Sequence, residues 1–382
     1  MLTLLTNARL YAPAPRGLCQ LLIADRRLAA IAAADAPALA SGPTVTVLDL
    51  EGRRVIPGLV DPLVHVTGGG GEGGFGSRTA ELGLEEALAS GVTTLVGALG
   101  TDAVTRTPAG LLGKVRELAA GGLSAYCYTG SYQLPPVTLT GSVREDILFG
   151  PEVIGVGEVA ISDHRGSQPT TAELTRLAAE ARTAGMLAGK GGIVFIHTGD
   201  APTHLEPLRE VARTSAIPLA QFLPTHINRT RELFEDGVRF AREGGRIDFT
   251  TSTTPALIAD GEVPAAEAAA RALHARVEPS RITLSSDANA SLPRFDAEGR
   301  FAGLEPGRLG SLFEVLGECV EAHGLPLERA LGMASTHAAD ALGLARKGRL
   351  AEGFDADLLV LADGAWTIDE VWALGRRVHR RG

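Results

Sequence analysis

Three histidines and one aspartate stand at the ends of short apolar runs in the sequence. His65, His197 and His226 each close a run rich in branched apolar residues, and Asp287 closes the run ITLSSD. Imidazole nitrogens and carboxylate oxygens are the usual protein ligands of zinc and similar divalent ions. A single histidine at a strand end is more often a hydrogen-bonded structural residue. Four potential ligands at equivalent positions, however, predict a metal site.

The apolar runs alternate with longer helical patterns between about residue 55 and residue 290. Alternating strand and helix patterns predict a parallel sheet, and eight repeats predict a (β/α)8 barrel. Catalytic residues of such barrels lie at the C-terminal ends of the strands, which is where the ionisable residues stand. The eight expected strands end near His65, Gly100, Tyr132, Asp163, His197, His226, Ser252 and Asp287.

Both ends of the chain follow a different pattern from the middle. Residues 1–57 and 345–382 show short alternating runs separated by turns, which is typical of antiparallel strands. We therefore expect these two segments to pair as a small β-sandwich domain, while residues 58–344 form the barrel.

Composition limits the classes of function. The chain has 382 residues, 45% of them hydrophobic, so it can bury a large core. Its cysteines, Cys19, Cys127 and Cys319, show no CxxC spacing, which fits a reducing cytoplasm better than a disulfide framework. The sequence has no run of about 18 apolar residues and no basic leader, so we expect neither a membrane span nor secretion. A net charge of −9 argues against a nucleic-acid partner.

Six segments resemble, in the same order, motifs of the isoaspartyl (β-aspartyl) dipeptidases of the amidohydrolase superfamily. They are PGLVDPLVHVTGGGGEGG, GTDAVTRTP, GSYQLPPVTLTGSV, AISDHRGSQP, LPTHINR and TLSSDANAS. Dihydroorotases, hydantoinases and N-acetylglucosamine-6-phosphate deacetylases share the architecture but not the combination SDHR, PTHxNR and SSDxNxS. The resemblance implies a barrel with a β-sandwich, a metal-dependent hydrolase, a small dipeptide substrate and a homo-oligomer.

The resemblance also implies roles for two catalytic residues. Asp287 is expected to be the general base, which takes a proton from metal-activated water and passes it to the leaving amine. The alternative for Asp287 is a strand-end cap. Tyr132 is expected to donate its phenol hydrogen to the developing oxyanion, and its alternative is an ordinary core tyrosine.

A β-aspartyl dipeptide carries one ammonium group and two carboxylates, so its recognition needs an acid and cationic or hydroxyl donors. The resemblance assigns Glu72 to the ammonium group, Arg165 and Arg229 to the carboxylates, and Ser291 to the aspartyl end. A solvated surface arginine and a flexible glycine loop are the alternatives, and His164 could orient Arg165 or pack in the core. The expected substrate-binding set is Gly71, Glu72, Thr101, Arg165, Arg229 and Ser291.

Two positions depart from the family pattern. The family begins its barrel with a His-x-His pair, whereas this chain has Leu63 in place of the first histidine. The family also bridges two metals with a carboxylated lysine on the fourth strand, and the segment VIGVGEVAISDHR contains no lysine. This segment has one extra residue, so either Glu158 or Gly157 occupies the bridging position. We favour Glu158 because a carboxylate is a competent metal ligand.

These departures predict one tightly bound metal, zinc, and at most a weak second one. Glu158, His197 and His226 supply the His2Glu composition of a catalytic zinc site. The expected metal ligands are His65, Glu158, His197, His226 and Asp287. The leading functional hypothesis is hydrolysis of β-aspartyl dipeptides. Its alternatives are an amidohydrolase acting on N-acyl amino acids or cyclic amides, and a catalytically impaired paralogue that binds isopeptides.

Overall fold

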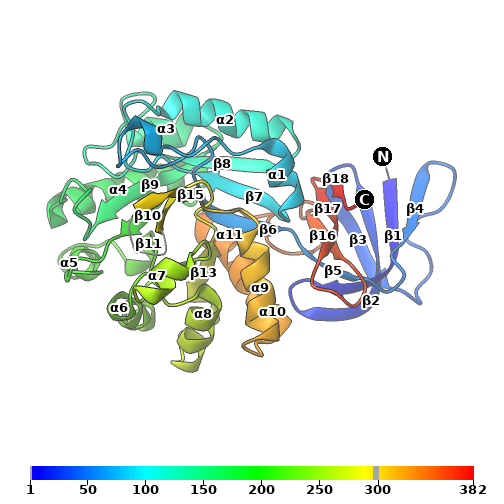
Figure 1. Cartoon of the computed structure of the whole chain (residues 1–382). Helices are drawn as coiled ribbons and strands as arrows, with labels where there is room; N and C mark the ends of the chain where they lie inside the picture. Colours follow the sequence, from blue (N-terminus) through cyan, green and yellow to red (C-terminus); the bar gives the residue numbers. More distant parts are fainter. Residues whose placement is uncertain (1, 296–300) are drawn as a thin grey trace.

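A computed structural model describes residues 2–295 and 301–382, and its larger part is an eight-stranded barrel (Figure 1). Six parallel strands form one sheet and two form another. A parallel bridge between Val64 and Ala288 and a hydrogen bond from the Ile227 amide to the Asp248 carbonyl (3.3 Å) join the two sheets at both edges. The predicted barrel is therefore confirmed. Its strands are β6 (Leu59–Val64), β7 (Val92–Gly97), β8 (Ser124–Thr129), β9 (Val153–Ile161), β10 (Ile193–Thr198), β11 (Phe222–Thr225), β12 (Ile247–Thr250) and β13 (Ile282–Ser285).

Helices cover the outside of the barrel, and their sequences explain where they begin. In α4, the Thr170 side chain accepts a hydrogen bond from the Glu173 amide, and the Glu173 carboxylate accepts one from the Thr170 amide, which makes a capping box. The helices are α1 (Leu84–Ala89), α2 (Pro108–Ala120), α3 (Val143–Phe149), α4 (Thr171–Ala188), α5 (Glu206–Thr214), α6 (Arg231–Arg242), α7 (Pro255–Ala259), α8 (Ala265–His274), α9 (Ser311–Glu321), α10 (Leu327–Ala334) and α11 (Thr336–Leu342). Short 3-10 turns span Phe75–Ser77, Leu219–Gln221 and Pro279–Arg281.

The two ends of the chain meet in one β domain, where the blue and red strands of Figure 1 lie side by side. Its strands form a single hydrogen-bonded sheet in the order β18-β17-β16-β5-β1-β2-β3, with β4 paired to β1. Residues from both halves of this sheet share a buried core, which requires the sheet to bend over itself. The strands are β1 (Leu2–Tyr11), β2 (Pro15–Ala24), β3 (Arg27–Ala33), β4 (Val45–Asp49), β5 (Arg54–Pro57), β16 (Leu358–Leu361), β17 (Ile368–Ala373) and β18 (Arg376–Arg380).

One expected strand proved to be two. The run from residue 53 to residue 65 contains β5, which pairs with β16 in the β domain, and β6, which begins the barrel. Gly58 separates them, and a Cβ atom there would lie 2.2 Å from the Thr93 Oγ1. The chain therefore crosses between the two sheets at a residue that has no side chain.

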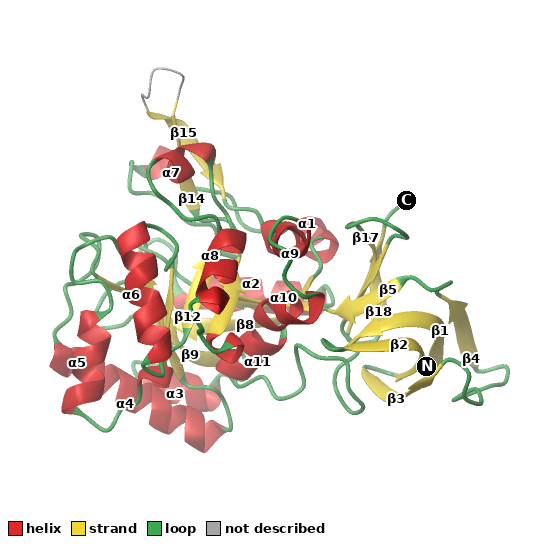
Figure 2. Cartoon of the chain, turned by 90° about the horizontal axis from the view of Figure 1, so that it is seen from below, coloured by secondary structure: helices red, strands yellow, loops and turns green. Residues whose placement is uncertain are grey.

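A hairpin that the sequence did not predict follows the eighth barrel strand. It consists of β14 (Ser291–Phe295) and β15 (Phe301–Pro306), which are antiparallel. Figure 2 shows this hairpin and α7 projecting from the same end of the barrel. Both elements therefore border the end at which the predicted site residues stand.

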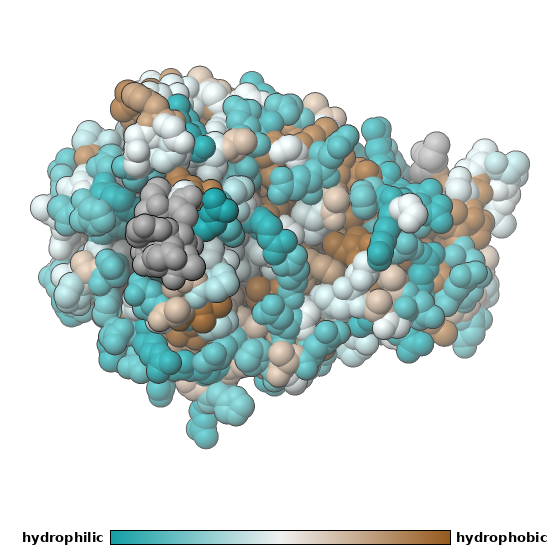
Figure 3. Space-filling model, viewed as in Figure 1, coloured by the Kyte–Doolittle hydropathy of each residue, from teal (hydrophilic) through white to brown (hydrophobic). Residues whose placement is uncertain are grey.

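Hydrophilic side chains predominate on the face of the molecule drawn in Figure 3, where the apolar patches are small and separate. Within residues 2–295 and 301–382, no helix is long and apolar enough to cross a membrane.

Candidate active site

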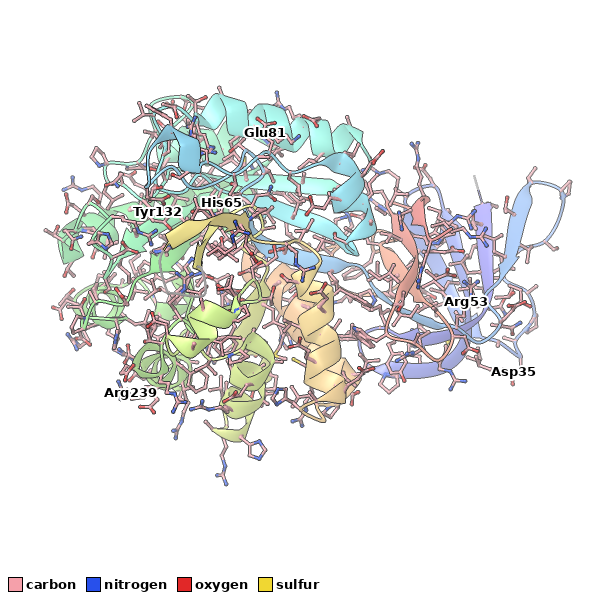
Figure 4. The ribbon with its side chains drawn as sticks, in the orientation of Figure 1. Asp35, Arg53, His65, Glu81, Tyr132 and Arg239 are labelled. Atoms are coloured by element: carbon pink, nitrogen blue, oxygen red, sulfur yellow. The ribbon has the colours of Figure 1, made fainter. Side chains whose placement is uncertain are left out.

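Most of the predicted site residues line one cavity of about 230 Å³ at the C-terminal ends of the barrel strands. His65 and Tyr132 approach it from different strands beside the β14–β15 hairpin (Figure 4). Glu158 lies beneath the cavity and is fully buried. The predicted residues in the cavity wall are His65, Glu72, Thr101, Tyr132, Arg165, His197, His226, Arg229, Asp287 and Ser291.

Glu158, His197 and His226 form a compact group of possible metal ligands. One ligand atom from each residue lies within 4.8 Å of the others. The Glu158 Oε2 is 3.5 Å from the His197 Nδ1 and 3.7 Å from the His226 Nε2. The Nδ1 of His226 is 2.7 Å from the Thr250 hydroxyl oxygen, which leaves Nε2 facing the group. This set has the composition of a catalytic zinc site.

Buried oxygens without hydrogen-bond donors show that the site suits a cation. Both carboxylate oxygens of Glu158 and the Oδ1 of Asp287 have no hydrogen-bond partner in the described part of the chain. His65 lies beside them, with its Nε2 3.2 Å from the Glu158 Oε1 and 3.2 Å from the Asp287 Oδ1. Leaving buried carboxylate oxygens unpaired is costly, and a divalent ion among them would satisfy them. The donors present therefore fit the metal that the sequence predicts.

The protonation of the histidines follows their surroundings. Although burial opposes protonation, the carboxylates of Asp287 and Glu158 raise the pKa of His65 to about 10. Burial, together with repulsion from Arg229 and His197, lowers the pKa of His226 to about 4. His226 is therefore neutral at physiological pH, as a metal ligand must be.

Glu158 points inward because β9 contains an extra residue. Val156 pairs with Val194 and Val159 pairs with Ile196, so three steps along β9 correspond to two along β10. This is a β-bulge, a device that often redirects a side chain near an active site. Gly157 occupies the other bulge position, where a Cβ atom would lie 2.8 Å from atoms of Phe195. Of the two candidates for the bridging position, the structure thus brings Glu158 to the histidines.

Leu63 contributes no ligand. Its side chain is fully buried and belongs to the apolar cluster inside the barrel that includes Val60, Val96 and Phe195. Its amide donates to the Asp61 Oδ1 at 3.1 Å. The family's first histidine is thus replaced by a residue that extends the barrel core.

The sequence analysis assigned no role to Asp163, which proves central. Its Oδ2 lies 2.9 Å from the His197 Nε2, and its two oxygens accept from the Arg165 Nε at 3.0 Å and Nη2 at 2.6 Å. Such a carboxylate fixes the orientation of a metal-binding imidazole. His164, for which the sequence suggested either an orienting role or a place in the core, does not pack in the core, because its side chain is 90% exposed. Its Nδ1 lies 3.7 Å from the Asp163 Oδ1, and its orienting role stays a prediction. The SDHR motif does contain the residue that contacts His197, but that residue is Asp163 and not His164.

Tyr132 faces the same group from the loop that follows β8. Its hydroxyl oxygen is 2.7 Å from the His197 Nδ1, and the Arg165 guanidinium lies 5.6 Å from its ring centroid. Burial and the negative charge of Glu158 raise the pKa of Tyr132 well above its ordinary value. The phenol therefore stays protonated and can donate a hydrogen bond.

The substrate-binding residues stand around the cavity mouth. The Thr101 hydroxyl donates to the Glu72 Oε1 at 2.8 Å, and that oxygen lies 3.6 Å from an Arg165 nitrogen. Gly70 approaches Ser291 so closely that a Cβ atom would lie 2.9 Å from the serine Cβ. Gly71 is not in the cavity wall, because its amide is turned away to the Ser77 carbonyl at 3.2 Å. Of the glycine-rich loop, Gly69 and Gly70 line the cavity instead.

Two of the predicted ligands adopt left-handed backbone conformations. His226, with φ 64°, directly follows β11. Asp287, with φ 53°, is the second residue after β13. Such conformations are unfavourable for residues with a Cβ atom and concentrate at functional sites. These two positions therefore support the assignment of the cavity as the active site.

Comparison with known proteins agrees with this geometry. The model of the amidohydrolase family matches residues 54–378. A β-aspartyl dipeptidase from the thermophilic, keratin-degrading Fervidobacterium islandicum AW-1, solved with β-Asp-Leu, is 38% identical over 99% of this chain and 96% of that one (TM-score 0.89). Another structure of β-aspartyl dipeptidase from this organism is 36% identical over 100% of this chain and 97% of that one (TM-score 0.90). An enamidase, 18% identical with a TM-score of 0.67, shares the fold.

The family match covers both the barrel and the later strands of the β domain, and the resemblance seen in the sequence motifs is confirmed by these structures. The chain belongs to the amidohydrolase family, whose members are metal-dependent hydrolases.

Proposed function

We propose that the protein hydrolyses β-aspartyl dipeptides. The observation that carries this proposal is the combination, in one cavity, of a buried metal-type donor group with Glu72, Arg165 and Arg229. One acid and two arginines match one ammonium group and two carboxylates. The Fervidobacterium dipeptidase, solved with β-Asp-Leu, supports this choice of substrate.

Asp287 is the general base of the proposed reaction. Its Oδ1 faces His65 and has no hydrogen-bond donor in the described part of the chain, so it is available to a water molecule. It accepts a proton from the attacking water and delivers it to the leaving nitrogen. Tyr132 donates its phenol hydrogen to the carbonyl oxygen as negative charge develops there.

Glu158, His197 and His226 would hold the metal, with His65 and Asp287 beside it. A bound zinc ion would act as a Lewis acid on the scissile carbonyl and lower the pKa of water. We expect one tightly held ion, because Leu63 supplies no donor, and no response to bicarbonate, because β9 contains no lysine to carboxylate.

Binding follows from the charges at the cavity mouth. Glu72 holds the ammonium group, and Arg165 and Arg229 hold the carboxylates, while Thr101 and Ser291 add hydroxyl donors. Arg165 is already paired with Asp163, whereas no hydrogen bond or ion pair of the Arg229 side chain occurs within residues 2–295 and 301–382; only its backbone amide donates, to the His226 carbonyl at 2.9 Å. The homo-oligomeric state and the cytoplasmic location stay predictions.

Purified protein of measured metal content should be incubated with β-Asp-Leu and with α-Asp-Leu. Turnover of the β isomer alone supports the proposal, and the Asp287→Asn variant should lose that turnover because an amide cannot accept the proton of water. If N-acyl amino acids or cyclic amides are turned over instead, the enzyme is a different amidohydrolase. If metal-loaded protein binds β-Asp-Leu but does not hydrolyse it, the protein is a catalytically impaired paralogue that binds isopeptides.

A further inference from the structure

The two sides of the active-site cavity differ in chemistry. The loops after β6, β7 and β9 supply the acid, hydroxyl and guanidinium groups of Glu72, Thr101 and Arg165. The segments after β11, β12 and β13 supply the rest of the wall, including Arg229, Asp287 and Ser291. This part also contains Leu257 and Leu292, which are the only aliphatic side chains larger than alanine lining the cavity in the described part of the chain.

Leu257 is held next to the segment that carries Arg229. It belongs to α7, and its amide donates to the Thr254 hydroxyl oxygen at 3.3 Å. Its carbonyl accepts from the Glu262 amide at 3.0 Å, and the next amide, that of Val263, donates to the Asn228 carbonyl at 2.8 Å. The loop that contains α7 is thus hydrogen-bonded to the residue immediately before Arg229.

Leu292 reaches the same wall from the β14–β15 hairpin. It is 6% exposed, and it also lines a neighbouring cavity together with residues 251–253, which follow β12. The side chain therefore lies between the active-site cavity and the loop that leads to α7. Figure 2 shows the hairpin and α7 next to each other at this end of the barrel.

We propose that Leu257 and Leu292 form the subsite for the side chain of the leaving residue and that the enzyme prefers aliphatic leaving residues. The inference rests on the proposed function, because it needs a β-aspartyl substrate whose aspartyl end lies at Glu72 and Thr101. The leaving residue then lies toward Arg229, and its side chain meets the two leucines. An aliphatic side chain gains from this burial, whereas a polar side chain of the same size loses water without gaining a partner.

The test compares leaving residues that differ in one property at a time. β-Asp-Leu and β-Asp-Asn have leaving side chains of similar size but different polarity, and β-Asp-Ala removes size alone. For the wild-type enzyme, kcat/KM for β-Asp-Leu should exceed each of the others about tenfold or more. In the Leu257→Asn variant, the ratio of kcat/KM for β-Asp-Leu to kcat/KM for β-Asp-Asn should fall several-fold. Ile258→Asn is the matched control, because Ile258 is 42% exposed on the same helix and does not line the cavity.

Equal kcat/KM values for the three dipeptides would overturn the proposed subsite. So would a Leu257→Asn variant in which the ratio of kcat/KM for β-Asp-Leu to that for β-Asp-Asn is the same as in the wild type. If Leu257→Asn does not fold, Leu292→Thr tests the subsite instead. Its melting temperature should first be shown to equal that of the wild type. Binding of the same dipeptides to metal-loaded Asp287→Asn, measured by calorimetry, separates the two proposals. A preference for β-Asp-Leu in binding without any turnover by the wild type would refute the proposed function and leave the subsite standing.

Discussion

Asp163 illustrates how a residue without direct access to substrate can control a ligand. It contacts both the His197 Nε2 and the Arg165 guanidinium, so the proposed metal ligand and the proposed substrate-binding cation share one anchor. These two partners, despite its burial, hold the pKa of Asp163 well below its usual range. The carboxylate is therefore charged at neutral pH.

Asp163→Asn should weaken zinc binding by about 10- to 100-fold, because the uncharged amide orients and polarises His197 less well. Competition with a chelating dye measures this affinity directly, independently of turnover. His164→Ala is the control, since that side chain is 90% exposed and should leave zinc affinity unchanged. Equal affinities in wild type and Asp163→Asn would contradict the role given to this carboxylate.

We propose that Leu63 limits the number of metal ions that the site can hold. The residues that remain around a second position, His65 and Asp287, already contact each other at 3.2 Å. Leu63→His restores a third donor at that place. We expect the metal content after dialysis against a mild chelator to rise from one to about two ions per chain.

Leu63→Asn, which introduces a polar group without a strong metal ligand, should leave the metal content at one. Two tightly bound ions in the wild-type protein would refute the single-metal hypothesis. The same conclusion would follow if bicarbonate were needed to reconstitute the apo-protein.

Residue type and position pointed to Glu158, His197 and His226, which the structure brings together as a possible metal group, but not to the hydrogen-bond partners of those histidines. Histidines at strand ends can be found in a sequence because barrel topology gathers all strand ends at one rim. The partners of those histidines, Asp163 and Thr250, follow from rotamers and bulges that a sequence does not display. The role of Gly71 was misplaced by one or two residues for the same reason, since loop geometry decides which amide faces the cavity.

At the scale of elements, the glycine-rich loop after β6 depends on the loop after β7. Arg106 donates to three carbonyls of the first loop, those of Thr67 (2.9 Å), Gly70 (3.3 Å) and Thr79 (3.3 Å). This single side chain closes the loop on both sides of Glu72. Arg106 is therefore a positioning residue for substrate recognition.

Arg106→Met should raise KM for β-Asp-Leu about tenfold and change kcat and zinc content little, because the loop loses its fixed shape while the metal group is untouched. Arg106→Lys should recover part of the loss, since a lysine can reach fewer of the three carbonyls. The exposed Arg144→Met on α3 serves as control. A fall in zinc content equal to the change in KM would show that Arg106 acts on the barrel as a whole instead.

Elements of the barrel were predicted better than the elements added to it. In α4, for example, the Thr170–Glu173 capping box and the buried face of Leu174, Leu177 and Ala178 are local features that the sequence itself displays. By contrast, β5 and β6 form one continuous apolar run; the expected domain boundary after residue 57 falls between them, and their pairing with β16 and β7 shows that they belong to different sheets. The β14–β15 hairpin was not predicted, because its two short strands pair with each other and do not repeat the alternation of strand and helix that marks the barrel.

At the scale of the whole molecule, the β domain and the barrel share a core. Alternate residues of β16 face opposite ways: Leu358 and Val360 pack inside the β domain, while Leu359 and Leu361 join the cluster that continues into the barrel. The β domain is therefore packed firmly against the barrel on one side. A buried ion cluster adds a second connection.

Lys347 is the centre of that cluster. It is 5% exposed, and its Nζ donates to the Ser124 hydroxyl of barrel strand β8 at 2.6 Å and to Asp357, just before β16, at 2.7 Å. Asp355 lies 2.9 Å away. Burial alone would lower the pKa of Lys347, but these two carboxylates raise it above its ordinary value.

Lys347→Met should lower the free energy of unfolding by about 3–5 kcal/mol, because it leaves two carboxylates without their buried cation. Denaturant unfolding measures the loss. The double variant Lys347→Met, Asp357→Asn should recover part of it, since one of the unpaired charges is then gone. Because the folded pKa of Lys347 is raised, its contribution is fully present below about pH 10.5 and disappears as the pH rises through the higher folded value. A loss below about 1 kcal/mol at pH 7, the range of exposed ion pairs, would mean that the shared apolar core alone holds the two parts together.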